Sequence, residues 1–525
     1  MEGRSHGPEI TRRRLLELGA VGAAAGMAGP LADALAARRP RWPTARLGPG
    51  AARRVDPRQF LPASQLLAWQ RELDAVGLRA TGTREHERYV DRLRDRLERV
   101  GVRHVGFEPV PLRRWSVSRG SWSLAVVDGP GAGPVRTASY IPYSGVTPAR
   151  GVEGQLVAYD PAHPPAPGSL RGKIALFDVP PASLSYGVFT AVAYKAYDPR
   201  GVFQPDATYA RPWLGQKPVV DALEALGAAG AAGLVAVLDL PADAAHGTYY
   251  PYDGHIRHAP GLYVDRATGA RLRAVAAAGG RVRLKLPAVV KRVTTRNLVG
   301  IIPGASSELM LLHSHTDGPN AIEDNGPDAI VAMSQYLARL PRRSLPRTIM
   351  VLLTTGHFVG GAGTEAWIAR HRRGTIRRTA GALTIEHLGA REWLPGPDGR
   401  TRLTGRPEPG TFFCPESSAL VNPSYRSMVK AKAAPSSVLR PYLPSPHSPD
   451  GGTWPAEGQG LWADAAIPTT NYITGPTYLL NWGIPTVDKL DLARMRAESI
   501  AFTQLLLDLS RTPRSRLRRL DLRRA

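Results

Sequence analysis

The stretch LLHSHTDGPNAIEDNG, residues 311–326, decides the fold because it joins an apolar run to a dense group of polar side chains. The apolar run predicts a buried strand, and His315, Asp317 and Asp324 follow at its end. In parallel sheets covered by helices, reacting groups gather at the carboxyl ends of the strands. Imidazole and carboxylate groups are also common ligands of a catalytic zinc ion. We therefore expect a metal-centred site at this edge of a sheet.

Further apolar runs lie on either side of this stretch, separated by helical patterns. NLVGIIPG (297–304), RTIMVLLTTG (347–356) and GALTIEHLG (381–389) predict strands, whereas residues 328–340 and 363–371 predict helices. Strands that alternate with helices are typical of an α/β fold with a mostly parallel sheet flanked by helices. We expect this fold for the larger part of the chain.

A mainly β module is predicted as an insertion in this fold. From Gly129 onward, short alternating runs such as GQLVAYD (154–160) and GKIALFD (172–178) are separated by glycine and proline. Because 525 residues exceed what one hydrophobic core usually serves, two folded units are expected. The predicted segments are a signal peptide at 1–36, a linker at 37–55, a catalytic domain in two parts at 56–128 and 293–511, the module at 129–292, and a basic tail at 512–525.

The N-terminal segment is typical of a twin-arginine export signal. TRRRLL (11–16) precedes a mild apolar run that ends in Ala-Leu-Ala at 34–36. We therefore expect the protein to be exported and to be extracellular or associated with the cell envelope. No later run is long and apolar enough to span a bilayer. With Cys414 as the single cysteine, an internal disulfide is excluded.

The formal net charge of +24 raises the question of an anionic partner. Nucleic acid is not expected, because the arginines are scattered and no nucleic-acid-binding module is recognisable. The densest basic run of the mature chain is at 514–524. It predicts either a solvated end or a weak contact with anionic polymers of the envelope.

With these motifs in order, the sequence resembles zinc-dependent aminopeptidases and glutamate carboxypeptidase-like exopeptidases, which often contain an inserted protease-associated domain. The resemblance covers most of the mature chain. It rests on GLRATGT (77–83), GKIALFD, NLVGIIPG, the His-x-Asp and Asp-Asn-Gly motifs, AAIPTTNYITGP (465–476) and YLLNWGIPTVDKLD (478–491).

The resemblance implies a site with named roles. The family usually holds two zinc ions that share a bridging aspartate. His315 matches the histidine of one ion, Asp324 the bridge, and Asp317 the carboxylate that orients the histidine. Glu386 stands where the family has an aspartate on the same ion. One complete shell is therefore expected, with a position left open for water.

The second shell of the family is not present. His357 and Phe358 replace the Glu-Glu pair that supplies the general base and a ligand, and Asn481 replaces the last histidine. Phenylalanine cannot coordinate a metal, and an amide oxygen is a poor zinc ligand. We therefore expect one zinc ion instead of two.

His357 has three possible roles. As a general base, it takes a proton from the attacking water. As a fourth ligand, it fills the open position and suppresses hydrolysis. It is otherwise a histidine without a part in catalysis.

Other residues near the motifs have alternative interpretations. We expect His313 to be a satisfied core histidine that faces away from His315. His387 faces away from the site if the strand continues, and a kink at the strand end turns it inward. Glu323 is either a spare carboxylate or simply solvated. Candidate substrate contacts are Asn481, Trp482 and Trp462, although the two tryptophans are equally explained by structural packing.

The function predicted from these features is an exported metal-dependent hydrolase that cleaves an amide bond in a peptide or an N-acyl amino acid. The alternative is a non-catalytic protein that keeps the peptidase fold and binds peptides or glycans of the envelope. Loss of the usual general base is what this alternative predicts.

Overall fold

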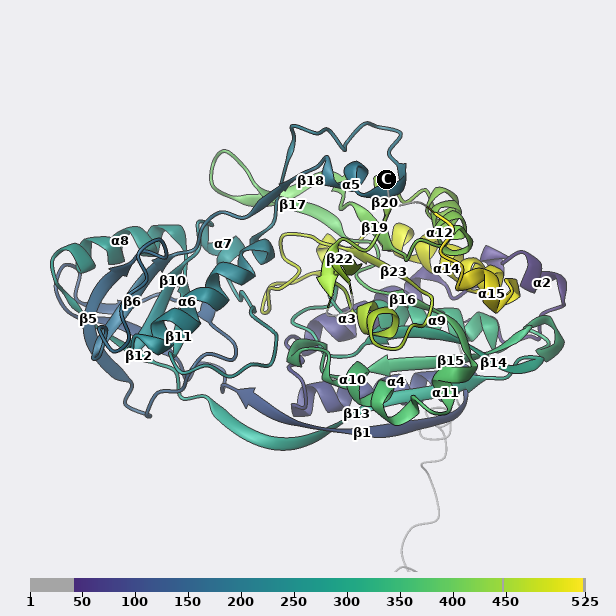
Figure 1. Ribbon diagram of the computed structural model, residues 1–525, viewed down its shortest axis with the longest axis horizontal. Coiled ribbons are helices and arrows are strands. Elements are labelled where there is room, and N and C mark those ends of the chain that lie inside the picture. The colour runs from purple at the N-terminus through teal and green to yellow at the C-terminus, as the bar shows by residue number, and fades with distance from the viewer. Residues whose placement is uncertain (1–41, 446–447, 523–525) are drawn as a thin grey trace, which may run out of the picture. The chain divides into compact units, whose positions relative to one another are not determined.

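A nine-stranded sheet carries the apolar runs identified in the sequence (Figure 1). Its strands, in spatial order, are β1 (Arg103–Ser116), β13 (Val289–Ile302), β15 (Arg347–Thr354), β14 (Ser306–His315), β16 (Thr379–Ile385), β23 (Thr469–Thr474), β19 (Gly410–Phe413), β20 (Ser436–Leu439) and β8 (Ala193–Tyr197). The four middle strands β15, β14, β16 and β23 are parallel. The expected α/β fold is therefore confirmed.

Toward both edges the sheet becomes antiparallel, so its parallel part is smaller than expected. β1 pairs antiparallel with β13, and β13 with β15; at the other edge β8 pairs antiparallel with β20. The physical difference lies in burial. Every residue of β16 is buried, whereas β1 has exposed residues along its length. Strands buried on both faces favour parallel pairing under helices, and partly exposed strands do not require it.

Helices cover both faces of this sheet. α9 (Gly326–Leu337) packs on β14 and contacts α3 (Ala63–Val76), α4 (Arg84–Arg99) and α14 (Leu492–Arg511). α10 (Ala362–His371) packs against β1 and β13 and contacts α13 (Gln459–Ala463). On the α10 side, Leu309, Leu311 and Leu352 form a core with Trp367 and Ile368.

The computed structural model describes residues 42–445 and 448–522. The predicted signal peptide at 1–36 lies outside the described residues, as do residues 37–41 of the predicted linker and the last three residues of the predicted tail. The helices and strands of the described residues all belong to one compact unit, Pro43–Ala525. Among the described residues, none of the helices combines the length and apolar character that crossing a membrane requires.

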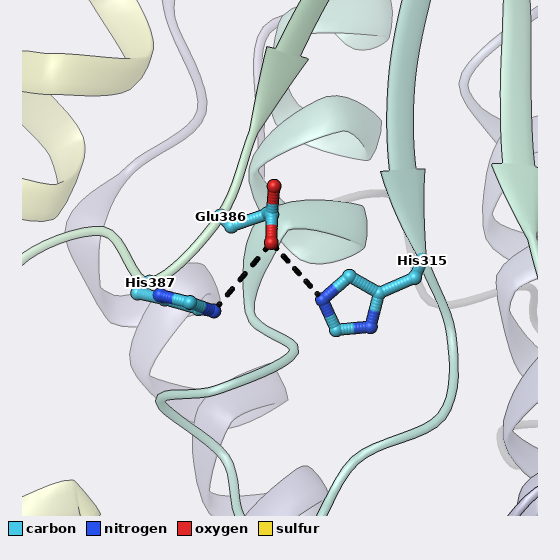
Figure 2. A group of neighbouring side chains, drawn as sticks. All are labelled: His315, Glu386 and His387. Atoms are coloured by element: carbon cyan, nitrogen blue, oxygen red, sulfur yellow. Dashed lines mark ion pairs between the residues drawn. The ribbon is translucent and has the colours of Figure 1, made fainter. Parts of the chain in front are cut away.

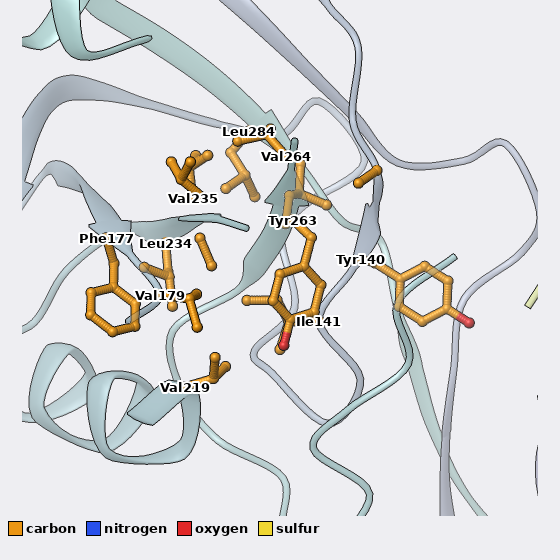
Figure 3. Close-up of a cluster of buried hydrophobic side chains, with 14 of the residues drawn as sticks. Tyr140, Ile141, Phe177, Val179, Val219, Leu234, Val235, Tyr263, Val264 and Leu284 are labelled. Carbon is orange, nitrogen blue, oxygen red and sulfur yellow. The ribbon is translucent and has the colours of Figure 1, made fainter. Parts of the chain in front are cut away.

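A second sheet of eight strands is built from the glycine-rich part of the chain. In spatial order its strands are β3 (Gly133–Val135), β2 (Ser123–Asp128), β12 (Arg281–Lys285), β5 (Val152–Tyr159), β6 (Lys173–Asp178), β10 (Gly233–Val237), β11 (Gly261–Val264) and β4 (Ser139–Tyr140). Helices α6 (Gln216–Ala228) and α8 (Arg266–Ala277) pack against its strands. Apolar side chains such as Leu234, Val235 and Tyr263 fill its core (Figure 3). We call this unit the module.

One segment leaves the module and joins the larger sheet. It contains β7 (Ser183–Ser185), α5 (Val188–Ala191), β8 and β9 (Thr208–Ala210), and we call residues 183–211 the strap. At its end Arg211 is buried, and its guanidinium lies 2.9 Å from Glu408 Oε2 and 3.4 Å from Glu392 Oε1. The strap therefore ties the module to the nine-stranded sheet through β8 and to the segment around Glu392 and Glu408 through this ion pair.

We predict that Arg211→Ala destabilises the protein by about 3–5 kcal/mol, because it leaves the buried carboxylate of Glu408 without its cation. Urea unfolding followed by circular dichroism measures the change. Arg273→Ala is the matched control, since Arg273 pairs with Asp178 on the exposed surface of the module. Its expected cost is about 0–1 kcal/mol. Equal costs for the two variants would contradict the role assigned to Arg211.

Candidate metal centre

The carboxyl ends of three adjacent parallel strands bring the polar motifs together. His315 is the last residue of β14, and Glu386 and His387 follow β16. His357 follows β15 and opens the short 3₁₀ helix η4 (His357–Val359), while Glu323 lies in the turn before α9. Because β15, β14 and β16 are neighbours, their ends meet at one edge of the sheet. The predicted convergence of His315 and Glu386 is therefore observed.

The side chains approach one another closely, and Figure 2 shows three of them, His315, Glu386 and His387. His315 Nε2 lies 3.5 Å from Glu386 Oε2 and 3.7 Å from Glu323 Oε1. His387 Nε2 lies 3.7 Å from the same two oxygens. His357 Nε2 lies 4.0 Å from Glu323 Oε1. These distances define two overlapping groups of candidate metal ligands, His315 with Glu386 and His387, and His315 with Glu323 and His357.

Hydrogen bonds fix the orientation of the three imidazoles. Nδ1 of His315 donates to the carbonyl of Asp317 at 2.9 Å, and Nδ1 of His387 donates to the carbonyl of Thr474 at 2.7 Å. Nδ1 of His357 lies 2.6 Å from Glu457 Oε2. A carbonyl only accepts, so Nδ1 of His315 and of His387 carries a proton, and Nε2 is the nitrogen that faces the carboxylates. Partners of this kind orient histidine ligands toward a metal.

Buried atoms without partners mark the same place. Nε2 of His315, Nε2 of His387 and Oε2 of Glu323 are buried and have no hydrogen-bond partner among the described residues. A buried polar atom without a partner costs about 1–3 kcal/mol, so such atoms are uncommon in folded proteins. Imidazole nitrogen and carboxylate oxygen are zinc ligands. The donor set therefore fits one divalent cation.

Charges within the cluster shift the pKa values of its members. Burial alone would lower the pKa of His315, but the carboxylates of Glu323 and Glu386 raise it well above the ordinary value. Burial alone would raise the pKa of Glu386, but the close approach of His315 and the charge of His387 lower it to about 2. The cluster therefore favours the ionised form of Glu386.

Asp324, the expected bridging ligand, lies elsewhere. Its Oδ2 accepts from Arg79 Nε at 2.8 Å and its Oδ1 from Arg79 Nη2 at 2.5 Å, and both side chains are fully buried. The neighbouring Glu323 faces His315 instead. The structure does not bring His315, Asp324 and Glu386 together as the expected shell, because adjacent residues of this turn point to different sides.

Asp317 is near the cluster, but its contacts differ from those expected. Its backbone carbonyl, and not its carboxylate, accepts from His315. The carboxylate accepts the backbone N–H groups of His357 at 3.2 Å and Phe358 at 3.0 Å, together with the hydroxyl of Thr81 at 2.5 Å. Asp317 therefore holds the turn that carries His357.

Glu457 was not predicted from the sequence. Besides His357, it accepts hydrogen bonds from the hydroxyls of Thr354 at 2.7 Å and Thr364 at 2.6 Å. Burial would raise the pKa of Glu457, but the hydrogen bond and charge of His357 hold it well below the ordinary value. The pKa of His357 is raised: burial and the charge of His315 would lower it, but Glu457 and Glu323 together outweigh both. Glu457 lies 100 residues beyond His357, in a loop without a recognisable motif.

His313 and His387 each resolve an open alternative. His313 bonds to the hydroxyls of Thr384 and Thr354, and burial lowers its pKa to about 4, so it is a neutral core histidine. The expectation that it faces away from His315 is wrong, since residues two apart on a strand share a face. His387 turns inward because the chain kinks there, with φ at 55°.

A cavity of about 680 Å³ opens beside His357 and Glu457. Trp454 lies in its wall, and the module contributes Tyr252. The ring of Tyr252 packs over that of His357, with centroids 5.5 Å apart and planes at 30°. The volume lies within the range of small-molecule sites, about 300–1,000 Å³.

The three expected substrate contacts do not line this cavity. The amide of Asn481 donates to the carbonyls of Ala244 and His246 in the module. Trp462 packs beside a core formed by Phe413, Leu439 and Trp454. Trp482 lines a different cavity. Trp454 is the tryptophan of this region that reaches the cavity beside His357.

Neither a protein-family model nor a curated protein matches the chain. Solved structures share its fold at low sequence identity. A peptidase M28 precursor from Shewanella amazonensis matches with a TM-score of 0.60 and 16% identity, covering 86% of this chain and 96% of that one. A zinc aminopeptidase from Bacillus subtilis gives 0.58 and 14%, covering 86% and 97%. An aminopeptidase from Aneurinibacillus sp. strain AM-1 gives 0.52 and 14%, covering 86% and 93%.

We predict that Glu323→Gln lowers the affinity for zinc, whereas Asp324→Asn lowers the stability of the fold. Glu323→Gln weakens zinc binding by roughly tenfold or more, because a carboxylate facing the cluster is lost. Asp324→Asn costs about 3–5 kcal/mol of stability by leaving Arg79 buried and unpaired, yet folded protein keeps its zinc. Elemental analysis after dialysis and urea unfolding measure the two effects. Loss of zinc in Asp324→Asn alone would restore Asp324 as the ligand.

Proposed function

We propose that the protein is an exported metal-dependent hydrolase of the zinc aminopeptidase type, which cleaves an amide bond in a peptide or an N-acyl amino acid with one metal ion. The convergence of His315, His387, Glu323 and Glu386 beside an open cavity carries this proposal. Structures with the same fold include zinc aminopeptidases, which supports zinc and a peptide-like substrate. The twin-arginine motif in the sequence supports export. The module then corresponds to the protease-associated domain of such enzymes.

His315, Glu386 and His387, one of the two groups of candidate ligands, are the proposed holders of the ion, and Glu323 faces the same two histidines. Two carboxylates offset the charge of a divalent cation, and two imidazoles offer neutral nitrogen ligands. When bound there, zinc supplies Lewis acidity that polarises a carbonyl oxygen and makes water more acidic. Asp317 and Thr474 hold the imidazoles in the required orientation through their carbonyls.

His357 is the proposed general base. Glu457 holds its Nδ1, so Nε2 faces the cluster and is free to accept a proton from the attacking water. Glu457 is then a positioning residue, which fixes the ring and stabilises the imidazolium that forms, as the aspartate of a serine-protease triad does. The proton later passes from His357 to the leaving amine. The competing role, a fourth metal ligand, predicts loss of metal when His357 is removed.

Tyr252 is the proposed donor to the substrate carbonyl. Its ring lies on His357, and its loop is anchored by hydrogen bonds of its backbone N–H to Gln216 Oε1 and of its carbonyl to the N–H of Gly360, both at 3.2 Å. Burial, followed by the charges of Glu323 and Glu386, raises the pKa of the Tyr252 hydroxyl. A phenol donates a hydrogen bond at neutral pH.

We expect purified protein to contain about one zinc per chain and to hydrolyse part of a panel of aminoacyl and N-acyl amino acid substrates. Chelation should abolish turnover, and zinc should restore it. His315→Ala should lose both metal and turnover. His357→Ala should keep the metal and lose turnover by roughly 10²–10⁴-fold, because only the proton acceptor is removed. Elemental analysis and a chromogenic assay measure these effects.

His163→Ala is the matched control for the histidine variants, because His163 is exposed and pairs only with Asp160. It should behave as the wild type. The proposed function is contradicted if the purified protein binds no divalent metal, or if chelators leave its turnover unchanged. Metal loss in His357→Ala would make His357 a ligand.

We also expect Tyr252→Phe to lower kcat by about 100-fold with little change in KM or zinc content, since it removes one donor to the developing oxyanion. Tyr250→Phe is the control, because the Tyr250 hydroxyl is buried without a hydrogen-bond partner among the described residues. Steady-state kinetics of the two variants tests this role. A Tyr252→Phe variant as active as Tyr250→Phe removes Tyr252 from the mechanism.

The second candidate is a non-catalytic protein that binds peptides or glycans of the envelope. His357 and Phe358 at the place of the usual Glu-Glu pair favour it. The same substrate panel separates the two, because this candidate predicts tight binding of peptides without turnover at any zinc concentration.

A further inference from the structure

A second cavity, of about 630 Å³, lies between the module and the start of the catalytic domain. Five aromatic residues line it: Trp115, Trp122, Tyr140, Tyr249 and Trp482. Trp122 meets Trp482 edge to face, with centroids 5.9 Å apart, and meets Tyr140 in the same manner at 5.0 Å. The rings of Trp122 and Trp482 are partly exposed, and the others are buried. The cavity therefore has a rigid aromatic wall that is open to a ligand.

Polar groups surround this aromatic wall. Glu85 and Arg119 are both exposed at the cavity, and neither takes part in the ion pairs of the described chain. The backbone and hydroxyls of Ser116 and Ser118 lie beside them. Trp115 also lines the cavity, and its buried Nε1–H has no acceptor among the described residues. The cavity thus offers an acceptor, several donors and hydroxyls that accept and donate.

A sugar ring matches this combination better than an apolar ligand. The C–H face of a pyranose is apolar and packs on an indole or phenol ring, while its hydroxyls both donate and accept. An apolar side chain would pack on the rings, but it could form no hydrogen bond with Glu85 or Arg119 at the rim of the cavity. The volume, within the range of about 300–1,000 Å³ for ligand sites, accommodates a short oligosaccharide.

We propose that this cavity binds a sugar ring of a glycan chain. The site is separate from the metal centre, because no residue lines both cavities. Tyr249 and Phe358, whose rings lie 5.8 Å apart, stand between them. The proposal therefore does not depend on the hydrolytic function. A sugar bound in this cavity would attach the protein to a glycan and leave the metal centre accessible.

Titration of the full-length folded protein with chitotriose, cellotriose and maltotriose tests the proposal, with tryptophan fluorescence and calorimetry as readouts. At least one trisaccharide should bind at millimolar concentration or below. Trp122→Ala and Glu85→Gln should each weaken binding by about tenfold, the loss expected for one stacking ring or one charged hydrogen bond. Glu85→Gln covers the case in which Trp122→Ala fails to fold, because Glu85 is exposed.

Trp393→Ala is the matched control, since Trp393 packs against Tyr478 outside this cavity. It should bind the trisaccharide as the wild type does. Three outcomes overturn the proposal: none of the trisaccharides binds, binding survives Glu85→Gln and Trp122→Ala unchanged, or Trp393→Ala weakens it as much. Binding of indole with no binding of any sugar overturns it as well.

Discussion

Two buried carboxylates, Glu323 and Glu386, face the same imidazole at the end of the nine-stranded sheet, and the rest of the site depends on them. Burying ionised groups is costly unless they are paired or coordinate a metal. Three imidazoles surround these carboxylates, those of His315, His387 and His357. Their Nδ1 atoms are held by hydrogen bonds to Asp317, Thr474 and Glu457, respectively. Two carboxylates therefore lie beside imidazole rings of fixed orientation. A divalent cation would offset the negative charge and bind the nitrogens that face it.

Arg79 and Asp324 show how the fold isolates charge beside this centre. Their bidentate pair is fully buried one residue away from Glu323. A guanidinium cannot lose its proton, so it offsets Asp324 permanently and removes that carboxylate from competition for a metal. The pair also joins the loop before α4 to the turn before α9. Arg79 therefore offsets the charge of Asp324, while the next carboxylate along the chain, that of Glu323, faces His315.

The fold was largely predictable from the sequence, and the site only in part. The apolar runs ending in His315 and Glu386 are local signals, and the rule that parallel strands present their carboxyl ends at one edge brings these residues together. The choice between Glu323 and Asp324 depends on where Arg79, some 245 residues away, places its guanidinium. Glu457 reaches His357 from a loop without a motif, and His387 depends on a left-handed backbone kink. Such features are set by tertiary contacts and leave no periodic pattern.

The strap limits how the protein can move. The chain runs from the module to the edge of the larger sheet and back, and it is fastened there by β8 and by Arg211. A rigid-body rotation of the module away from the nine-stranded sheet would have to break the pairing of β8 with β20 and the ion pair of Arg211 with Glu408.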